Sequence, residues 1–300
     1  MVQVIEPENY RCSSRGFGHA IYYNTSHAYG CMRLRRLVRG RIDWPELETV
    51  VRTIAERYDR PTVHVRFLEA DNWLSTPMVV DEDLFVKVIS KQNTMVHALF
   101  TTGRNIGAFS SGTEGFFESF QTPYEMARHE LEATERMREL GVNAPEPIEA
   151  FEVQEYGVVV LEYLPDFRAL DELTDTETAL AGELFSALRT LHDAGLAHGD
   201  LRAENVLILD DELYFIDATN IRTEGQQSIQ SYDVACGLAA LEPLVGARAA
   251  VEAALGTYSV AELLDALDFL SFVRIRPDHE FDSASLTSEI EKQASDSRRA

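Results

Sequence analysis

Lysine and cysteine are scarce in this sequence, and long apolar runs are absent. Only Lys87, Lys91 and Lys292 are lysines among its 27 basic residues. The three cysteines form no C-x-x-C pair, which excludes a disulfide framework and argues against a zinc site. No apolar run approaches the roughly 18 residues of a membrane-spanning helix, and acidic side chains stand near the N-terminus where a signal peptide would be basic and then apolar. We therefore expect a soluble, cytoplasmic protein that binds no membrane.

The rest of the composition is that of a globular chain with an acidic surface. The 300 residues are 45% hydrophobic, which suits one large or two medium domains. Acidic residues outnumber basic ones by 50 to 27, and the formal net charge is −23. This excess, with so little lysine, resembles the proteins of organisms that live at high salt, archaea among them, where surface carboxylates keep proteins soluble. A lysine retained in such a chain is a candidate for a specific function.

The basic residues are concentrated near the N-terminus. The stretch 11–41 contains no acidic residue and interleaves aromatic side chains with its arginines. These arginines are Arg11, Arg15, Arg33, Arg35, Arg36, Arg39 and Arg41. Such a segment is typical of contact with nucleic-acid phosphates, and the last five arginines are the candidate contacts. The alternative is that the segment docks onto the acidic remainder of its own chain.

Hydrophobic periodicity predicts a strand-rich first half and a helical second half. A helix is expected from Trp44 to about Arg57, with Asp43 as its N-cap and Glu46 completing a capping box. The other expected elements are strands at 63–67, 78–80, 84–90 and within 153–163, a helix at 123–140, and helices from a capping box at Thr174 onward to Val273, with a helix starting at Tyr232. The residues from Pro277 are expected to form a polar, frayed tail.

This order of elements predicts an α+β fold with two lobes. The expected divisions are a basic extension at 1–60, an N-lobe at 61–163 with a long flexible loop at about 95–122, a helical C-lobe at 164–276 and a tail at 277–300. A ligand is expected in the cleft between the lobes.

The segment 196–217 carries most of the recognisable chemistry. A polar loop after a predicted helix holds Asp200 and Asn205, two short apolar strands follow, and Asp217 comes directly after the second strand. Asn205 and Asp217 therefore flank a hairpin and can share one cation. Oxygen ligands of this kind suit Mg²⁺, which takes its other ligands from water and phosphate. Asp200, one loop away, is placed to accept a proton from a hydroxyl group.

This ordering resembles the catalytic loop and the metal-binding aspartate of the protein-kinase-like fold. The resemblance implies an antiparallel sheet with a helix C in the N-lobe, a mainly helical C-lobe, and a strand lysine that holds the phosphates of ATP. Lys87, in the apolar strand 85–89, matches that lysine. It also implies a helical glutamate as partner of this lysine, for which Glu130 is our choice, with Glu132 and Glu135 as alternatives.

Two further segments match the fold's ATP-binding regions. Leu161, Glu162 and Tyr163 resemble the connection between the lobes, whose backbone binds adenine, with Leu161 as the residue behind the base. The expected phosphate-binding loop at 69–75 contains no glycine. Because backbone approaches phosphate most easily at glycine, Ser75 is the candidate contact there.

Several details resemble the RIO-type atypical kinases in particular. They are the loop 198–201 (His-Gly-Asp-Leu), Ala218 directly after the metal-binding aspartate, the stretch 141–147 (GVNAPEP), and the long separation between Lys87 and Glu130. No A-P-E motif follows Asp217, and Gly199 replaces the arginine that binds an activation-loop phosphate in ordinary kinases. Docking of a protein substrate through an activation segment is therefore not expected.

The RIO resemblance implies an ATP-dependent serine/threonine kinase or ATPase that uses Mg²⁺ or Mn²⁺. Asp200 is then the base or water-positioning group, Asn205 and Asp217 hold the metal, and Asp217 is the position phosphorylated as an intermediate in RIO relatives. The family also implies work on small ribosomal subunit maturation, with the arginines on ribosomal RNA or the pre-ribosomal subunit. The alternatives are a small-molecule phosphotransferase of the aminoglycoside or choline kinase type, and a nucleotide-binding pseudokinase scaffold.

Overall fold

The computed structural model describes residues 20–24, 42–68, 75–94, 120–172, 178–218, 226–274 and 280–298. The predicted capping box at Thr174, the arginines of 11–41 and most of the expected loop at 95–122 lie outside these ranges. Among the described residues, no helix combines the length and the apolar character that crossing a bilayer requires.

The chain divides into two compact units, which we describe separately. The first comprises Met1–Phe100, Ser119–Leu131 and Glu146–Pro165, and the second comprises Thr101–Glu118, Glu132–Pro145 and Asp166–Ala300.

The first unit is built on one sheet of six strands. Its strands, in sheet order, are β1 (Ala20–Asn24), β2 (Thr62–Phe67), β3 (Thr76–Val80), β4 (Leu84–Ile89), β6 (Tyr156–Glu162) and β5 (Pro147–Val153). β1 runs parallel to β2, and all the other pairings are antiparallel. The expected meander of β2, β3 and β4 is therefore present, and the β5–β6 hairpin extends it.

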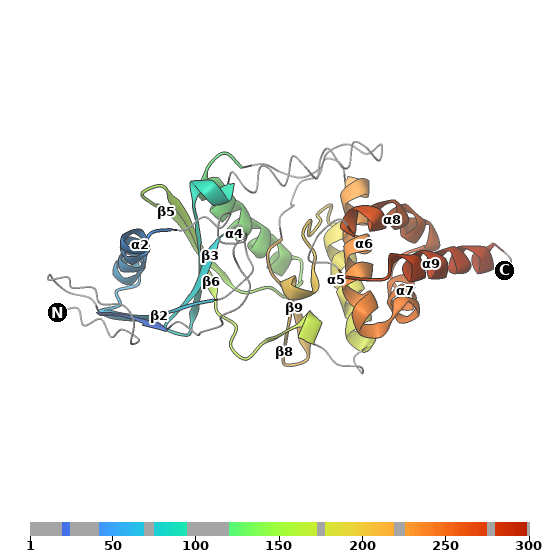
Figure 1. The fold of residues 1–300 in the computed structure, drawn as a ribbon, viewed down its shortest axis with the longest axis horizontal. Helices are drawn as coiled ribbons and strands as arrows, with labels where there is room; N and C mark the ends of the chain where they lie inside the picture. Colours follow the sequence, from blue (N-terminus) through green and yellow to red (C-terminus); the bar gives the residue numbers. More distant parts are fainter. Residues whose placement is uncertain are drawn as a thin grey trace. The chain divides into compact units, whose positions relative to one another are not determined.

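Helices cover both faces of this sheet, α2 (Trp44–Arg57) and α4 (Pro123–Glu139) (Figure 1). Successive side chains of β4 alternate between the faces. Val86 and Val88 join α2 in one apolar core, whereas Ile89 packs against Ala127 of α4 in another. Lys87, between the two valines, points to the α4 face.

Gly157 allows α4 to begin close to the sheet. A Cβ atom at this position would lie 2.1 Å from the backbone oxygen of Pro123, the first residue of α4. Only glycine permits this approach. The contact fixes the start of the helix that carries Glu130.

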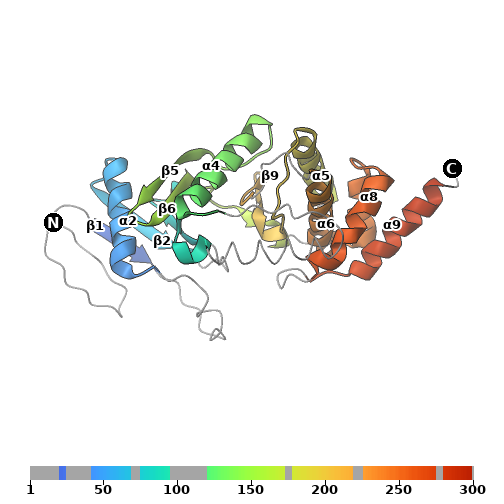
Figure 2. The same cartoon turned by 90° about the horizontal axis from the view of Figure 1, so that it is seen from above.

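The second unit is mainly helical (Figure 2). Its helices are α5 (Thr178–Asp193), α6 (Gln226–Val245), α7 (Ala247–Leu255), α8 (Val260–Val273) and α9 (Ser283–Ser297). Its small sheet consists of β7 (Arg168–Ala169), β8 (Val206–Leu209) and β9 (Glu212–Phe215), with 3₁₀ turns at Leu170–Glu172 and Ala203–Asn205. One apolar core joins all five helices to β8 and β9.

Three expectations from the sequence are wrong in detail. Glu46 forms no capping box with Asp43, because its carboxylate accepts a hydrogen bond from the Tyr156 hydroxyl instead. The helix expected to begin at Tyr232 begins at Gln226. The supposed frayed tail contains α9, which Asp282 caps by accepting from the N–H groups of Ala284 and Ser285.

The apolar face of α9 gives a prediction about stability. Leu286, Ile290 and Ala294 recur at every fourth residue and are buried in the helical core. Ile290→Ala should lower the free energy of unfolding by about 2–5 kcal/mol, as for other buried large-to-small changes. Chemical denaturation followed by circular dichroism measures this, and the exposed neighbour substitution Glu291→Ala is the control. Equal stability of the two variants would mean that α9 does not pack on the core.

Candidate active site

In the first unit, Lys87 forms a buried ion pair with Glu130. Lys87 Nζ lies 2.6 Å from Glu130 Oε1, and the two side chains are 5% and 14% exposed. A buried lysine is costly unless it is paired. Glu132 and Glu135, the alternative partners, are exposed on the same helix. Of the three carboxylates, α4 turns Glu130 toward β4.

The segment at the end of β6 has part of its backbone already engaged. The N–H of Glu162 donates to the carbonyl of Glu146 at 2.8 Å, and the N–H of Tyr163 donates to that of Asp83 at 2.9 Å. A base bound here therefore has to be recognised through other backbone atoms. Leu161 is 3% exposed and packs in the apolar cluster beneath α4.

Ser75 stands at the start of β3 with its hydroxyl turned inward. The residue is 9% exposed, and Oγ is buried without a hydrogen-bond partner among the described residues. The rest of the expected phosphate loop, 69–74, lies outside the described ranges.

In the second unit, Asp233 of α6 holds the catalytic loop by its backbone. Its carboxylate is fully buried and accepts from the N–H of His198 at 2.6 Å and of Gly199 at 2.9 Å. Gly199 has φ +80°, a conformation that disfavours residues with a side chain. The backbone thus explains why glycine precedes Asp200. Sequence reasoning missed Asp233, whose only local signal is a carboxylate within the apolar stretch 232–236.

The loop and the hairpin are tied to each other through Asn205. Asn205 Nδ2 donates to the backbone oxygen of Asp200 at 2.8 Å, and the N–H of Ile216 donates to the backbone oxygen of Asn205 at 3.0 Å. These bonds bring Asp200, Asn205 and Asp217 together in one unit. Asp217 has φ +61°, the left-handed region that Asp and Asn tolerate best among residues with side chains.

His198 is fully buried and packs near the Phe215 ring, at 6.2 Å between centroids. Burial lowers the pKa of His198 below its ordinary value, and this effect outweighs the nearby carboxylates, of which Asp233 is the strongest. The imidazole is therefore neutral at physiological pH and packs as an uncharged ring in the interior.

Arg202 is a second residue that sequence reasoning left without a role. Its Nη2 lies 3.6 Å from Asp200 Oδ2, and its Nη1 pairs with Glu204. The side chain is 21% exposed. A positive charge therefore stands beside the expected base, accessible from solvent.

The donor set fits Mg²⁺ as an ion shared with a nucleotide. In the described part of the chain, no group of three or more His, Cys, Asp and Glu side chains could hold a metal ion alone. Because Asn205 Nδ2 is engaged, Oδ1 is the atom left for a cation, and Asp217 adds a carboxylate. One amide and one carboxylate suit an ion that keeps its waters and binds phosphate oxygens.

Comparison with known proteins matches residues 115–234 to the RIO domain family. A probable bifunctional tRNA threonylcarbamoyladenosine biosynthesis protein of Thermoplasma acidophilum is 28% identical over 120 residues, 40% of this chain and 21% of that protein. The KEOPS complex subunit Bud32 of Pyrococcus abyssi is 31% identical over 98 residues, 31% of this chain and 43% of that protein.

A third relative is the 3-deoxy-D-manno-octulosonic acid kinase of Vibrio cholerae, 35% identical over 89 residues, 27% of this chain and 37% of that protein. The chain thus spans less than half the length of each of these curated relatives. Among solved structures, the Rio2 kinase–ADP/Mg²⁺–phosphoaspartate complex of Chaetomium thermophilum is similar at 16% identity and a TM-score of 0.47, over 85% of this chain and 78% of that one.

The family match covers α4, the catalytic loop, the β8–β9 hairpin and the start of α6. The first unit has a mostly antiparallel sheet with a helix on each face, and the second unit is mainly helical. Residues 115–234 therefore match a RIO domain, and the arrangement of helices and strands agrees with a protein-kinase-like fold.

Proposed function

We propose that this protein is an ATP-dependent phosphotransferase of RIO type, a serine/threonine kinase or an ATPase. The observation that carries the proposal is the buried Lys87–Glu130 ion pair. A lysine paired in this way, in a chain with two other lysines, is held in a fixed position. That is what binding the phosphates of a nucleotide requires.

In this proposal, residues of the second unit bind the metal ion, accept the proton and stabilise the transferred group. Asn205 and Asp217 would hold Mg²⁺, or Mn²⁺, which would neutralise phosphate charge when bound. The Asp200 carboxylate accepts the proton of the attacking hydroxyl group or water as the γ-phosphoryl group leaves ADP. Arg202, beside Asp200, stabilises the negative charge on the transferred group. When Asp217 itself is the acceptor, its carboxylate oxygen forms the new bond to the γ-phosphorus as the bond from that phosphorus to ADP breaks, and no proton has to be removed from the acceptor.

We further propose that the protein works on RNA or on an RNA-containing particle. The support is the arginine-rich segment 11–41, whose arginines lie outside the described residues. Maturation of the small ribosomal subunit is the role implied by the RIO resemblance. The name of the Thermoplasma relative, in contrast, points to tRNA. Filter binding to tRNA and to small-subunit RNA tests these two roles, with a variant in which Arg33, Arg35 and Arg36 are neutralised. If the segment instead docks onto its own chain, the variant should bind RNA with unchanged affinity.

A small-molecule phosphotransferase is the second candidate. The observation in its favour is the 35% identity with a sugar-acid kinase over 89 residues. Hydroxylated sugars and sugar acids are the acceptors to assay.

The decisive experiment is nucleotide binding followed by turnover. Mg·ATP should raise the melting temperature, and the rise should disappear with EDTA. Release of ADP is then measured for the wild type and for Asp200→Ala, at low and high salt, with protein, RNA and sugar acceptors. Turnover that Asp200→Ala abolishes supports a phosphotransferase. Binding without turnover in either protein would instead make the chain a pseudokinase scaffold.

A further inference from the structure

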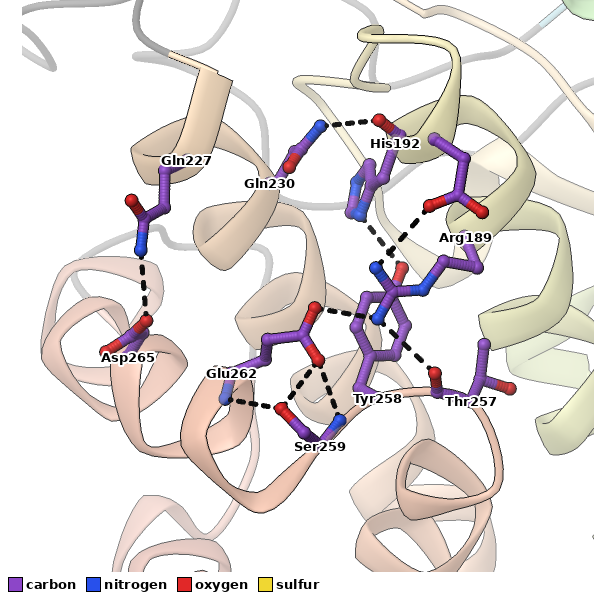
Figure 3. A network of polar contacts seen from close by, with 10 residues as sticks. Arg189, His192, Gln227, Gln230, Thr257, Tyr258, Ser259, Glu262 and Asp265 are labelled. Atoms are coloured by element: carbon purple, nitrogen blue, oxygen red, sulfur yellow. Dashed lines mark hydrogen bonds and ion pairs between the residues drawn. The ribbon is translucent and has the colours of Figure 1, made fainter.

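His192, at the C-terminal end of α5, contacts another side chain through each ring nitrogen. Nδ1 lies 2.9 Å from the hydroxyl oxygen of Tyr258 (Figure 3). Nε2 lies 3.3 Å from Asp233 Oδ2. All three residues are buried. The contacts connect the carboxylate beneath the catalytic loop to the junction of α7 and α8, where Tyr258 lies.

The partners of Asp233 determine which imidazole nitrogen carries the proton. An ionised carboxylate only accepts hydrogen bonds, and Asp233 already accepts two from the loop backbone. His192 Nε2 must therefore carry the hydrogen and donate to it. When Nε2 alone carries a hydrogen, Nδ1 has a lone pair, and the Tyr258 hydroxyl then donates to Nδ1. Burial raises the pKa of Tyr258 well above its ordinary value, which keeps this donor protonated.

The Tyr258 ring is itself held in place by charged groups. The Arg189 guanidinium lies 4.0 Å from the ring centroid and donates to Glu262 Oε1 at 2.7 Å and to the Thr257 carbonyl at 3.3 Å (Figure 3). It also lies 3.7 Å from Asp193. Glu262 forms the capping box that begins α8. Four charged residues therefore face His192 and Tyr258, namely Asp233, Arg189, Glu262 and Asp193.

We propose that Tyr258 is a positioning residue for the catalytic loop. Its hydroxyl fixes His192 as the Nε2–H tautomer, which supplies the third donor to Asp233 and so holds the backbone of residues 198–199. Tyr258 touches neither substrate nor reacting atoms, and it acts through His192. The effect on turnover rests on the proposed function, whereas the effect on the loop does not. The junction of α7 and α8 thus influences the geometry of Asp200.

The test uses Tyr258→Phe, which removes one oxygen atom and leaves the packing of the ring. The matched control is Tyr156→Phe in the first unit, another buried tyrosine whose hydroxyl donates to a carboxylate, that of Glu46. Hydrogen exchange of the His198 and Gly199 amides is measured by NMR, with the imidazole ¹⁵N shifts of His192. In Tyr258→Phe we expect mixed tautomers and exchange about tenfold faster at both amides, the scale of one lost buried hydrogen bond. If both amides exchanged in Tyr258→Phe at the rates of the wild type, the proposal would be overturned.

A double-mutant cycle tests whether the effect passes through His192. In His192→Gln the amide nitrogen can donate to Asp233, but the acceptor for Tyr258 is lost. Adding Tyr258→Phe to this variant should not change amide exchange further. If Tyr258→Phe accelerated amide exchange equally in the wild type and in His192→Gln, Tyr258 would act without His192, which contradicts the proposal.

Turnover separates this proposal from the proposed function. Tyr258→Phe should lower kcat about tenfold and leave the KM for ATP within about twofold, as expected for a lost positioning contact. An unchanged kcat beside faster amide exchange would show that the tyrosine holds the loop without positioning Asp200, and would overturn the proposal. If the wild type has no turnover, the proposed function fails and the exchange experiments alone decide.

Discussion

Lys87→Met removes the charge that we propose binds the phosphates of ATP, and it should lower kcat/KM for ATP by roughly 3–4 kcal/mol of transition-state free energy, about two to three powers of ten. Methionine keeps the length of the side chain within an apolar strand, so the sheet should remain folded. The loss has two parts, because the variant also leaves the 14%-exposed Glu130 carboxylate without its cation. Steady-state ADP release, with circular dichroism as a check on folding, gives the measurement.

Lys91→Met is the matched control for this substitution. Lys91 follows the same strand by two residues, but its side chain is 68% exposed and pairs with the exposed Glu155. Surface pairs of this kind contribute little, so kcat/KM should stay within about twofold of the wild type. Equal losses at the two lysines would remove the argument from the buried ion pair.

Asp217→Asn should lower turnover by about two to three powers of ten and raise the Mg²⁺ concentration needed for half-maximal activity. Asparagine is preferable to alanine here because Asp217 has a positive φ, which asparagine tolerates and alanine does not. The loss then reports on the ligand charge rather than on the backbone. Activity measured across a Mg²⁺ titration gives both quantities.

Asp211→Asn controls for the charge and for the conformation. Asp211 lies in the turn of the same hairpin, is exposed, and has φ +64°. Its substitution removes the same charge from the same type of backbone, and both turnover and the Mg²⁺ requirement should be unchanged. A Mg²⁺ requirement that shifts equally in both variants would assign the effect to overall charge, not to a metal ligand.

Much of the fold could be predicted because its signals are local. The strands alternate or are continuously apolar, and the residues from His198 to Asp217 lie within one loop and one hairpin. The family match and the two-unit architecture agree with the protein-kinase-like fold expected from that segment. The roles of the individual site residues remain predictions. The structure shows an ion pair between Lys87 and Glu130, and a hydrogen bond from the Asn205 side chain to the Asp200 backbone.

What sequence reasoning missed depends on contacts between distant residues. Asp233 supports a loop that lies 34 residues earlier in the chain, and Tyr258 reaches His192 across 66 residues. Neither contact has a local pattern. Glu46 favoured a capping box by spacing alone, but the Tyr156 hydroxyl, 110 residues away, takes its carboxylate. In α9 the polar majority concealed three apolar residues on one face, which are sufficient for packing against the core.

Because the sequence has only three lysines, chemical labelling of lysine can report on the ion pair of Lys87. Lys91 and Lys292 are 68% and 55% exposed, whereas Lys87 is 5% exposed and ion-paired. An amine-reactive reagent should therefore acylate the first two side chains quickly and Lys87 slowly, so that peptide mass spectrometry reads three well-separated sites. Because solvent-exposed amines react faster than buried ones, the rate of acylation at Lys87 measures how often its contact with α4 opens.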